Sequence, residues 1–315
     1  MILKFLFMQK ILLVFIALFA VSIHGWSQSK KKRDKDGVAV QVDRNVSYGK
    51  AVTQAGTEMD LKMDVYWTDS GSTELKPLVI LAHGGYFIAG DKGDFADECR
   101  FFAEEGFVAV SIQYRLIDVM NTDEVSMRAV IDAVHDMRAS VRFFYKSAAE
   151  ENGYGIVTNN VFIGGYSAGA ITSLHYAYAS SMADAEEMGG EWFVQYIAEN
   201  GGFEGKSGND GYSSKIRGVI NIAGSLHSAK FVESHEPVLY SAHGTDDGIV
   251  PYELGTTGET TVETEGSYLI HKQAELVGLR NYLRTFPGGN HASFFICRDC
   301  REEVSNFIKD NLFQP

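Results

Sequence analysis

Short apolar segments separated by helix-like stretches recur along the chain, and they limit its fold more than any other feature. Five of them are nearly continuous apolar runs, at residues 78–82, 107–112, 161–163, 216–222 and 238–242. Strands of this kind are buried on both faces, as in a parallel sheet covered by helices. Residues 38–48 and 59–67 instead alternate apolar and polar side chains, which predicts antiparallel strands at the start of the sheet. Residues 283–286 predict a last strand.

Helical patterns lie between these strands. They are expected at about 94–105, 124–150, 168–181, 267–277 and 299–311. In the second stretch, apolar side chains recur at three- and four-residue spacing, at Val130, Val134, Met137, Val141 and Phe144. The alternation predicts one α/β domain over residues 38–315, with a mostly parallel eight-stranded sheet flanked by helices. Residues 182–215 interrupt it with two glycine pairs and with the aromatic residues Trp192, Phe193, Tyr196 and Phe203, and predict a lid or insertion over the site.

The N-terminus has the pattern of an export signal. Basic residues at Lys4 and Lys10 precede an apolar run at 11–23 and a small-residue site at 25–27. We therefore expect residues 1–27 to be a cleaved signal peptide, residues 28–37 a polar leader, and the protein to be periplasmic or secreted. A retained anchoring helix is the alternative, although the run is shorter than the roughly 20 residues that span a bilayer. No later segment predicts a stable membrane span.

The charge balance argues against nucleic acid as a partner. The chain carries 28 basic and 41 acidic side chains, a net charge of −13. Loss of residues 1–27, which hold two lysines and no acid, would leave 26 basic side chains and a net charge of −15. Such acidity repels a phosphate backbone. The one basic run, at residues 30–33, is interpreted as part of the solvated leader, with a membrane-surface role as the alternative.

Three cysteines follow the signal segment. Cys297 and Cys300 form a C-x-x-C pair without the βαβ context of a thioredoxin-like motif. In an exported protein this spacing favours a local structural disulfide over free thiols or a thiol-redox role. Cys99 is expected to be a small buried residue on its helix. Two cysteines without a nearby histidine pair do not predict a zinc site, so no metal and no other cofactor is expected.

A Gly-x-Ser-x-Gly pentapeptide, residues 165–169, follows the apolar run at 161–163 and precedes a helical pattern. A serine on such a strand-to-helix turn is exposed at the carboxyl edge of the sheet, and glycines are needed where a Cβ would obstruct the turn. This pattern predicts Ser167 as a nucleophile. Chance also produces such pentapeptides in a glycine-rich chain, so the remaining parts of a catalytic site must decide.

Candidates for the base and the acid come later in the chain. His291 lies in a glycine-rich loop between the last predicted strand and the last helix, and a neutral imidazole suits a base near pH 7. Asp246 and Asp247 both follow the strand at 238–242. One of them can orient the base while the other caps or turns the loop. The residues alone do not choose between them.

Donors for a developing oxyanion are predicted after the strand at 78–82. The sequence His83-Gly-Gly-Tyr86 allows backbone amides to face a developing charge, and Gly85, Tyr86 and Ala168, the residue after the nucleophile, are the expected donors. A plain glycine turn is the alternative, with His83 in a structural hydrogen bond. The chain order of glycine loop, serine, aspartate and histidine, each just past a strand, favours the catalytic interpretation.

These motifs resemble those of the α/β-hydrolase superfamily, particularly carboxylesterases and lipases with an HGG-type oxyanion motif, the hormone-sensitive-lipase-like and arylformamidase-like branch. The resemblance covers roughly residues 55–312 and rests on five segments, residues 83–91, 113–116, 165–169, 243–251 and 289–291. In that family the acid commonly stands in Asp-x-x-Val-Pro, which implies Asp247 rather than Asp246. Tyr86 replaces the third glycine of the commonest form of the oxyanion motif.

The resemblance implies a serine carboxylic-ester hydrolase that acts on a small or medium ester through Ser167, His291 and Asp247. A serine peptidase or an arylformamidase on the same fold is an alternative, because the same triad cleaves amides. A non-catalytic binding module on a hydrolase fold is another, although such proteins typically lack a triad member. The segment at 182–215 and the C-x-x-C pair match no pattern of the family, so the acyl and alcohol groups stay open.

Overall fold

The computed structural model describes residues 39–69, 73–258 and 260–313. The predicted signal peptide and polar leader lie outside the described residues, so cleavage and export stay predictions. Among the described residues, no helix combines the length and the apolar character needed to cross a bilayer.

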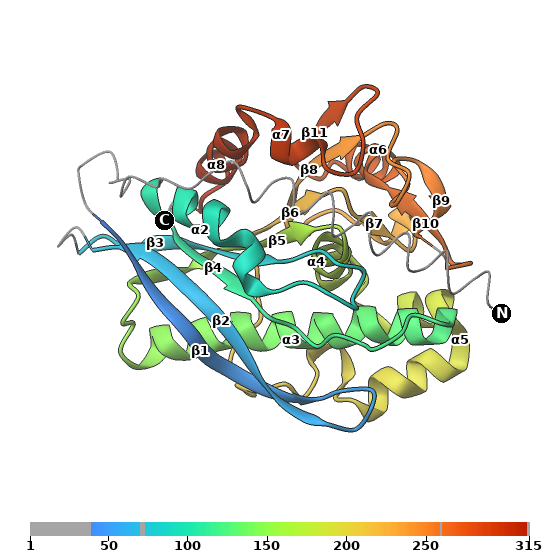
Figure 1. Cartoon of the computed structure of the whole chain (residues 1–315), viewed down its shortest axis with the longest axis horizontal. Helices are drawn as coiled ribbons and strands as arrows, with labels where there is room; N and C mark the ends of the chain where they lie inside the picture. The colour runs from blue at the N-terminus through green and yellow to red at the C-terminus, as the bar shows by residue number, and fades with distance from the viewer. Residues whose placement is uncertain (1–38, 70–72, 259, 314–315) are drawn as a thin grey trace.

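One eight-stranded sheet forms the centre of the molecule (Figure 1). Its first two neighbouring pairs, β1 with β2 and β2 with β4, are antiparallel, and all the other pairs are parallel. The α/β-hydrolase fold expected from the sequence is therefore confirmed. In spatial order the strands are β1 (Val40–Val52), β2 (Glu58–Thr68), β4 (Val108–Ile112), β3 (Lys76–Ala82), β5 (Ile156–Tyr166), β6 (Gly218–Ile222), β8 (Val238–Gly244) and β11 (Asn281–Phe286).

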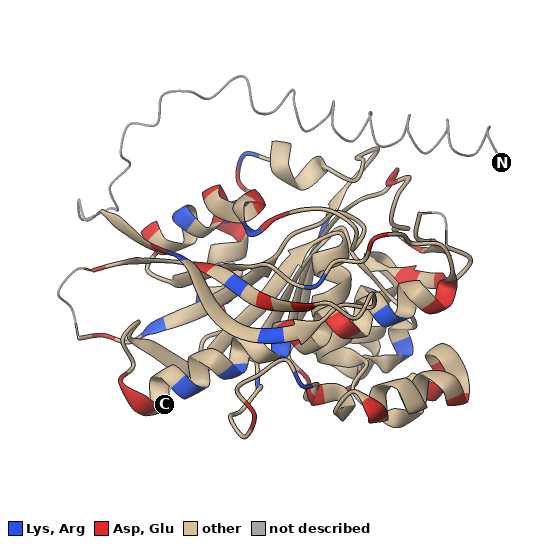
Figure 2. Cartoon of the chain, turned by 60° about the horizontal axis from the view of Figure 1, so that its bottom comes forward, with Lys and Arg blue, Asp and Glu red and all other residues tan. Residues whose placement is uncertain are grey.

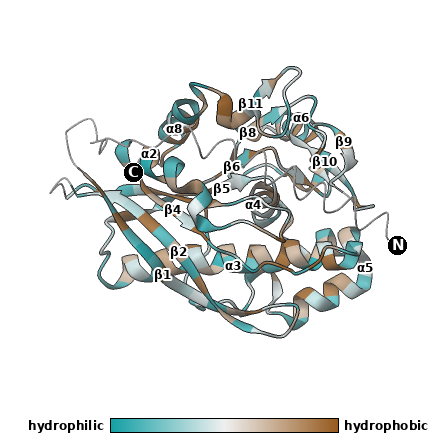
Figure 3. Cartoon of the chain, viewed as in Figure 1, coloured by the Kyte–Doolittle hydropathy of each residue, from teal (hydrophilic) through white to brown (hydrophobic). Residues whose placement is uncertain are grey.

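Helices cover both faces of the sheet, and the alternation of β3 shows how. Leu78, Ile80 and Ala82 pack with residues of α3, α4 and α6, whereas Val79 and Leu81 pack with α2 and α8 on the other face. Figure 3 shows the hydrophobic colour on the central strands and α4, and Figure 2 shows acidic and basic residues on the helices and on the outer strands. The helices are α2 (Ala96–Glu104), α3 (Asp123–Glu150), α4 (Ala168–Tyr178), α5 (Met182–Glu199), α6 (Ser267–Val277), α7 (Ser293–Ile296) and α8 (Cys300–Asp310).

Besides the four-residue helix α7 and short 3-10 turns, a helix and a small sheet were not expected from the sequence. The first is α5, which begins at a capping box formed by Ser181 and Asp184 and is kinked at Gly190, where φ is 68°. The second is a small sheet of β7 (Ser225–Leu226), β10 (Glu263–Gly266) and β9 (Leu254–Thr256). Both escape a search for hydrophobic periodicity, because the helix contains a glycine pair and these strands are two to four residues long with little apolar content.

Register places the ends of the parallel strands side by side. Ala82 of β3 pairs with Gly165 of β5, which pairs with Asn221 of β6, which in turn pairs with Ser241 of β8. β11 lies beyond β8 in the same direction. The loops that follow β3, β5, β8 and β11 therefore leave the sheet at one edge, where open α/β sheets bind ligands.

Candidate active site

Ser167 occupies the turn between β5 and α4 in a strained conformation, with φ 54° and ψ −118°. A left-handed φ is uncommon outside glycine and recurs at functional sites. Both glycines of the turn lie against β3. A Cβ on Gly165 would stand 2.4 Å from the carbonyl oxygen of Ala82, and one on Gly169 would stand 2.0 Å from the same atom. The Ser167 amide donates to the carbonyl of Ile222 at 2.9 Å. The two glycines of the pentapeptide are therefore required by this close approach to β3.

Asp247 and His291 come together at the same edge. Nδ1 of His291 donates to Oδ2 of Asp247 at 2.6 Å, and the Asp247 side chain is fully buried. Its other oxygen accepts from the amides of Ile249 at 2.9 Å and Val250 at 3.1 Å. Burial acts to raise the pKa of Asp247, but hydrogen bonds from His243 and His291 outweigh it and hold the pKa well below its ordinary value. The carboxylate is thus ionised and oriented toward an imidazole.

Asp246, which the residues alone left as an equal candidate, points elsewhere. It is exposed and accepts from the hydroxyl of Thr245 at 2.9 Å. Its amide donates to the carbonyl of Gly289 at 2.9 Å, which ties the loop after β8 to the loop that carries His291. The geometry therefore gives Asp246 a loop-stabilising position and Asp247 the contact with the histidine.

The ring of Tyr166 joins the serine turn to the histidine loop. Tyr166 directly precedes Ser167, and its ring centroid lies 4.8 Å from that of His291. Ser167 and His291 are each 7% exposed. The predicted nucleophile Ser167 and the histidine oriented by Asp247 therefore lie at one edge of the sheet in a largely water-excluded setting.

The glycine loop after β3 carries the expected oxyanion donors. Gly85 and Tyr86 have φ of 115° and 59°, and Ala168 is the first residue of α4, so its amide has no acceptor within the helix. Nδ1 of His83 donates to the carbonyl of Gly84 at 2.7 Å, which is the structural hydrogen bond considered for this histidine. A Cβ on Gly90 would stand 2.2 Å from the same nitrogen. The loop is therefore held in one shape by its own contacts.

A cavity of about 60 Å³ opens beside Ser167. No aspartate, glutamate, lysine or arginine lines it. The hydroxyl of Tyr86 donates to the carbonyl of Thr257 at 3.0 Å, which fixes the loop of the small sheet against the glycine loop after β3. The lining mixes hydroxyl-bearing and apolar residues: the small sheet and its loop contribute Ser225, Thr257, Thr260, Thr264 and Val262, and the rest of the fold contributes Ser126, Phe87, Met120, Met127, Val130, Ile171 and Met188.

The segment at 182–215 has two parts with different surroundings. α5 contributes Met188 to the cavity. The part that follows α5 is bound to α3, because the Ser207 hydroxyl donates to Asp136 at 2.6 Å and Glu204 pairs with Arg142 at 2.8 Å. A lid role is thus left to α5 alone, and it stays a prediction.

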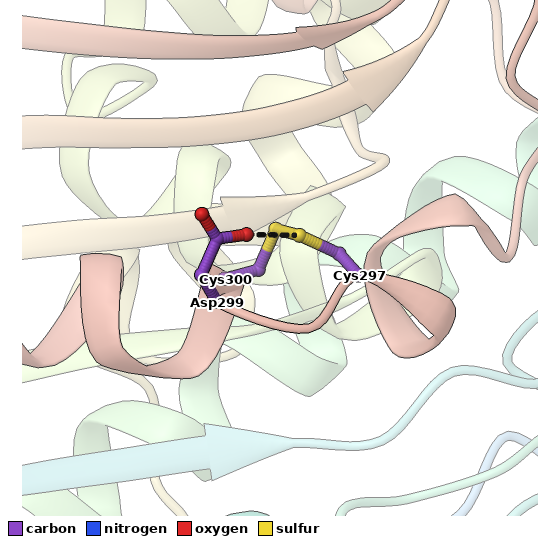
Figure 4. Close-up of side chains that lie close together, drawn as sticks. All are labelled: Cys297, Asp299 and Cys300. Atoms are coloured by element: carbon purple, nitrogen blue, oxygen red, sulfur yellow. Dashed lines mark hydrogen bonds between the residues drawn. A yellow bond between two sulfur atoms is a disulfide. The ribbon is translucent and has the colours of Figure 1, made fainter.

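Cys297 and Cys300 form a disulfide at the start of α8, as expected (Figure 4). Cys99 is buried with a free thiol. Asp299 approaches Sγ of Cys297 at 3.2 Å. These three residues are the only potential metal-ligand cluster in the described part of the chain. Sulfurs joined in a disulfide are not thiolates, so in this state the cluster lacks the ligands that a soft metal requires.

Sequence reasoning assigned no role to three histidines near the site. His243 donates to Asp247, while His175 and His227 line the cavity. His243 stands in the segment 243–251 that carried the family resemblance, so the sequence could have pointed to it as a residue of the site. His175 and His227 belong to no recognised motif, so the sequence offered no reason to select them.

The strained serine, the buried aspartate–histidine pair and the mostly parallel sheet define an α/β-hydrolase. The BD-FAE family, a family of α/β-hydrolase esterases, matches residues 63–225, just over half of the chain. The chain belongs to that family. No curated protein matches the chain in sequence.

Solved structures share the fold at low sequence identity. Thermogutta terrifontis esterase 2 phosphorylated by paraoxon is 19% identical with a TM-score of 0.62, over 88% of this chain and 96% of that one. The same esterase with propionate bound is also 19% identical with a TM-score of 0.62, over 89% and 97%. A truncated carbohydrate esterase from gut microbiota is 18% identical with a TM-score of 0.61, over 89% and 99%. At these identities the likeness concerns the fold.

Proposed function

We propose that the protein is a serine carboxylic-ester hydrolase with Ser167 as nucleophile, His291 as base and Asp247 as the acid that orients it. The observation that carries the proposal is the 2.6 Å bond from His291 to the buried Asp247 beside the strained Ser167 turn. An imidazole whose Nδ1 donates to a carboxylate presents a basic Nε2, the arrangement that activates a serine hydroxyl.

In the proposed reaction, Ser167 Oγ attacks the acyl carbon while His291 accepts its proton. The amides of Gly85, Tyr86 and Ala168 stabilise the oxyanion, and each such donor is typically worth about 3 kcal/mol. His291 then protonates the leaving alcohol, and a water molecule, deprotonated by the same histidine, releases the acid from the acyl-enzyme. These steps need no metal or cofactor.

The substrate proposed is an uncharged ester with a small acyl or alcohol group. The support is the cavity beside Ser167, which is small and is lined by no formally charged side chain. Propionate is bound in one solved esterase of the same fold, and another is described as a carbohydrate esterase. A lining that combines hydroxyl-bearing and apolar side chains suits an ester with a polar and an apolar group.

Hydrolysis of p-nitrophenyl acetate and butyrate tests the proposal, with an aminoacyl amide as comparison. The wild type should cleave the esters and bind a fluorophosphonate covalently, whereas Ser167→Ala should lose the label and about 10⁴-fold or more in kcat. Full activity of Ser167→Ala, or an inert wild type, would contradict it.

Export to the periplasm or the medium is also part of the proposal, and its support is the N-terminal sequence alone. The mature protein is expected to begin at Gln28. Mass spectrometry of the protein from each cell fraction measures this, and an uncleaved chain held in the membrane fraction would favour the anchoring helix.

A further inference from the structure

The carboxylate of Asp247 is shared between two histidines. Oδ2 accepts from Nδ1 of His291 at 2.6 Å and from Nε2 of His243 at 3.0 Å. The side chains of His243 and Asp247 are both fully buried. A triad needs only the first of these bonds, so the second imidazole requires an explanation of its own.

The surroundings of His243 determine which of its nitrogens carries the proton. Nε2 faces two acceptors, Oδ2 of Asp247 and, at 3.2 Å, the carbonyl oxygen of Val250. A nitrogen between a carboxylate and a carbonyl must donate, because neither oxygen has a hydrogen to give. His243 therefore presents Nε2–H to Asp247.

The other ring nitrogen is held by a buried polar chain. Nδ1 of His243 lies 2.8 Å from Oγ of Ser267, and that hydroxyl accepts from the side-chain amide of Asn221 at 2.9 Å. The alternative acceptor for the Ser267 hydroxyl, the carbonyl of Gly224, is farther away at 3.5 Å. The Ser267 hydroxyl thus donates to Nδ1, and Nε2–H faces Asp247.

Asn221 is itself fixed on β6. Its side-chain oxygen accepts from the amide of Gly224 at 2.9 Å, and its nitrogen also donates to Oγ of Ser241 at 3.1 Å. The chain Asn221, Ser267, His243 and Asp247 therefore runs under the carboxyl edge of the sheet from β6 through the start of α6 to the loop after β8. Every member contributes to the orientation of the next.

We propose that His243 is a positioning residue, whose Nε2–H holds Oδ2 of Asp247 toward His291 and balances part of the negative charge of that carboxylate. The proposal rests on the proposed function, in which His291 is the base. His243 touches neither substrate nor nucleophile and acts through Asp247.

Few other titratable groups face this cluster. Tyr166 of β5 packs on His291, and Tyr252, after β8, places its ring 5.7 Å from that of His243. Burial, followed by the charge of Asp247, raises the pKa of Tyr166 far above neutrality, so it stays uncharged. Among the described residues, no lysine or arginine pairs with Asp247, and Asp246 is exposed. The two imidazoles, on Oδ2, and the amides of Ile249 and Val250, on Oδ1, are therefore the donors that stabilise the carboxylate.

Removal of the donor should alter the pH profile in a definite direction. In His243→Leu, Asp247 loses one partner and its charge attracts the imidazolium of His291 more strongly. The acid limb of kcat/KM should then move to higher pH by about one unit, and kcat should fall about tenfold while KM changes little. His243→Gln, which returns an N–H donor near the position of Nε2, should restore the acid limb to nearly that of the wild type.

Ser267→Ala and His135→Leu separate orientation from general loss of stability. Ser267→Ala removes the donor to Nδ1 and should shift the acid limb in the same direction by a smaller amount. His135, a buried histidine bonded to Gly202 in another part of the molecule, is the matched control, and His135→Leu should lower Tm without moving the acid limb. If His243→Leu does not fold, Ser267→Ala and His243→Gln decide.

If the wild type is active and the acid limb of kcat/KM does not move in His243→Leu or Ser267→Ala, the inference is overturned. The proposed function would still stand in that case. An inert wild type that a fluorophosphonate does not label overturns the proposed function instead. In that case the downfield proton resonance of the bond between His291 and Asp247 still tests His243. Its titration should move to higher pH in His243→Leu, and an unchanged titration would contradict the positioning role.

Discussion

At the scale of single residues, Asp246 and Asp247 show how position decides role. The two carboxylates are adjacent in the chain, yet Asp247 is buried among four donors, whereas Asp246 is exposed beside Thr245. Burial alone would favour a protonated acid. The donors reverse this effect, because each hydrogen bond to the carboxylate favours its charged form.

Replacement of either aspartate by asparagine should therefore have very different effects. Asp247→Asn is expected to lower kcat about 10⁴-fold, since a neutral amide neither stabilises the imidazolium nor holds the correct tautomer of His291. Asp246→Asn is the neighbouring control and should change kcat less than twofold. Steady-state kinetics with p-nitrophenyl butyrate at neutral pH, with Tm for both variants, measures this. Equal losses in the two variants would contradict the assignment of Asp247.

At the scale of elements, the site is assembled from loops that follow strands at one edge of the sheet. The turn with Ser167 follows β5, and the glycine loop with Gly85 and Tyr86 follows β3. Asp247 follows β8 and His291 follows β11. The cavity needs further elements, since α3, α4, α5 and the small sheet β7–β10–β9 with its loop also line it. The cavity thus combines Tyr86, Ser167 and Ala168, from the loops after β3 and β5, with residues from other parts of the fold.

At the scale of the whole molecule, two buried histidines outside the triad make stability sensitive to acid. Burial lowers the pKa of His135 to about 3 and that of His175 to about 4. An unfolded chain protonates these rings near the ordinary imidazole pKa of about 6.5. Between that value and the lowered ones the unfolded state binds more protons, so the stability these groups contribute is lost as pH falls from about 6.5 toward 4.

The double variant His135→Gln with His175→Gln should therefore lose part of this dependence. Between pH 6.5 and 4.5, its free energy of unfolding should decrease less steeply than that of the wild type. The difference between the two slopes should correspond to up to about two fewer protons taken up on unfolding. Glu236, whose pKa burial raises to about 7, acts in the opposite direction and is unchanged in both proteins, so the difference isolates the histidines. Urea unfolding at several pH values measures it, and parallel slopes would refute the expectation.

Local sequence determined most of the fold and the identity of the candidate catalytic residues. Continuous apolar runs specify strands buried on both faces, and all eight expected strands are present within a few residues of their predicted bounds. The pentapeptide around Ser167 and the loop of His291 were recognisable because strand, turn and helix signals are local. The antiparallel start and the parallel remainder of the sheet follow from the same patterns.

Only the tertiary structure decided which groups face one another. The choice of Asp247 over Asp246 depends on the direction in which a loop turns, and the resemblance to a family, not the residues, had favoured it. The second imidazole on Asp247, the buried chain behind it and the small sheet at the cavity join residues far apart in sequence, such as Asn221 with Ser267 and Tyr86 with Thr257. Contacts of this kind leave no periodic or local signal, because they arise from the packing of separate elements against each other.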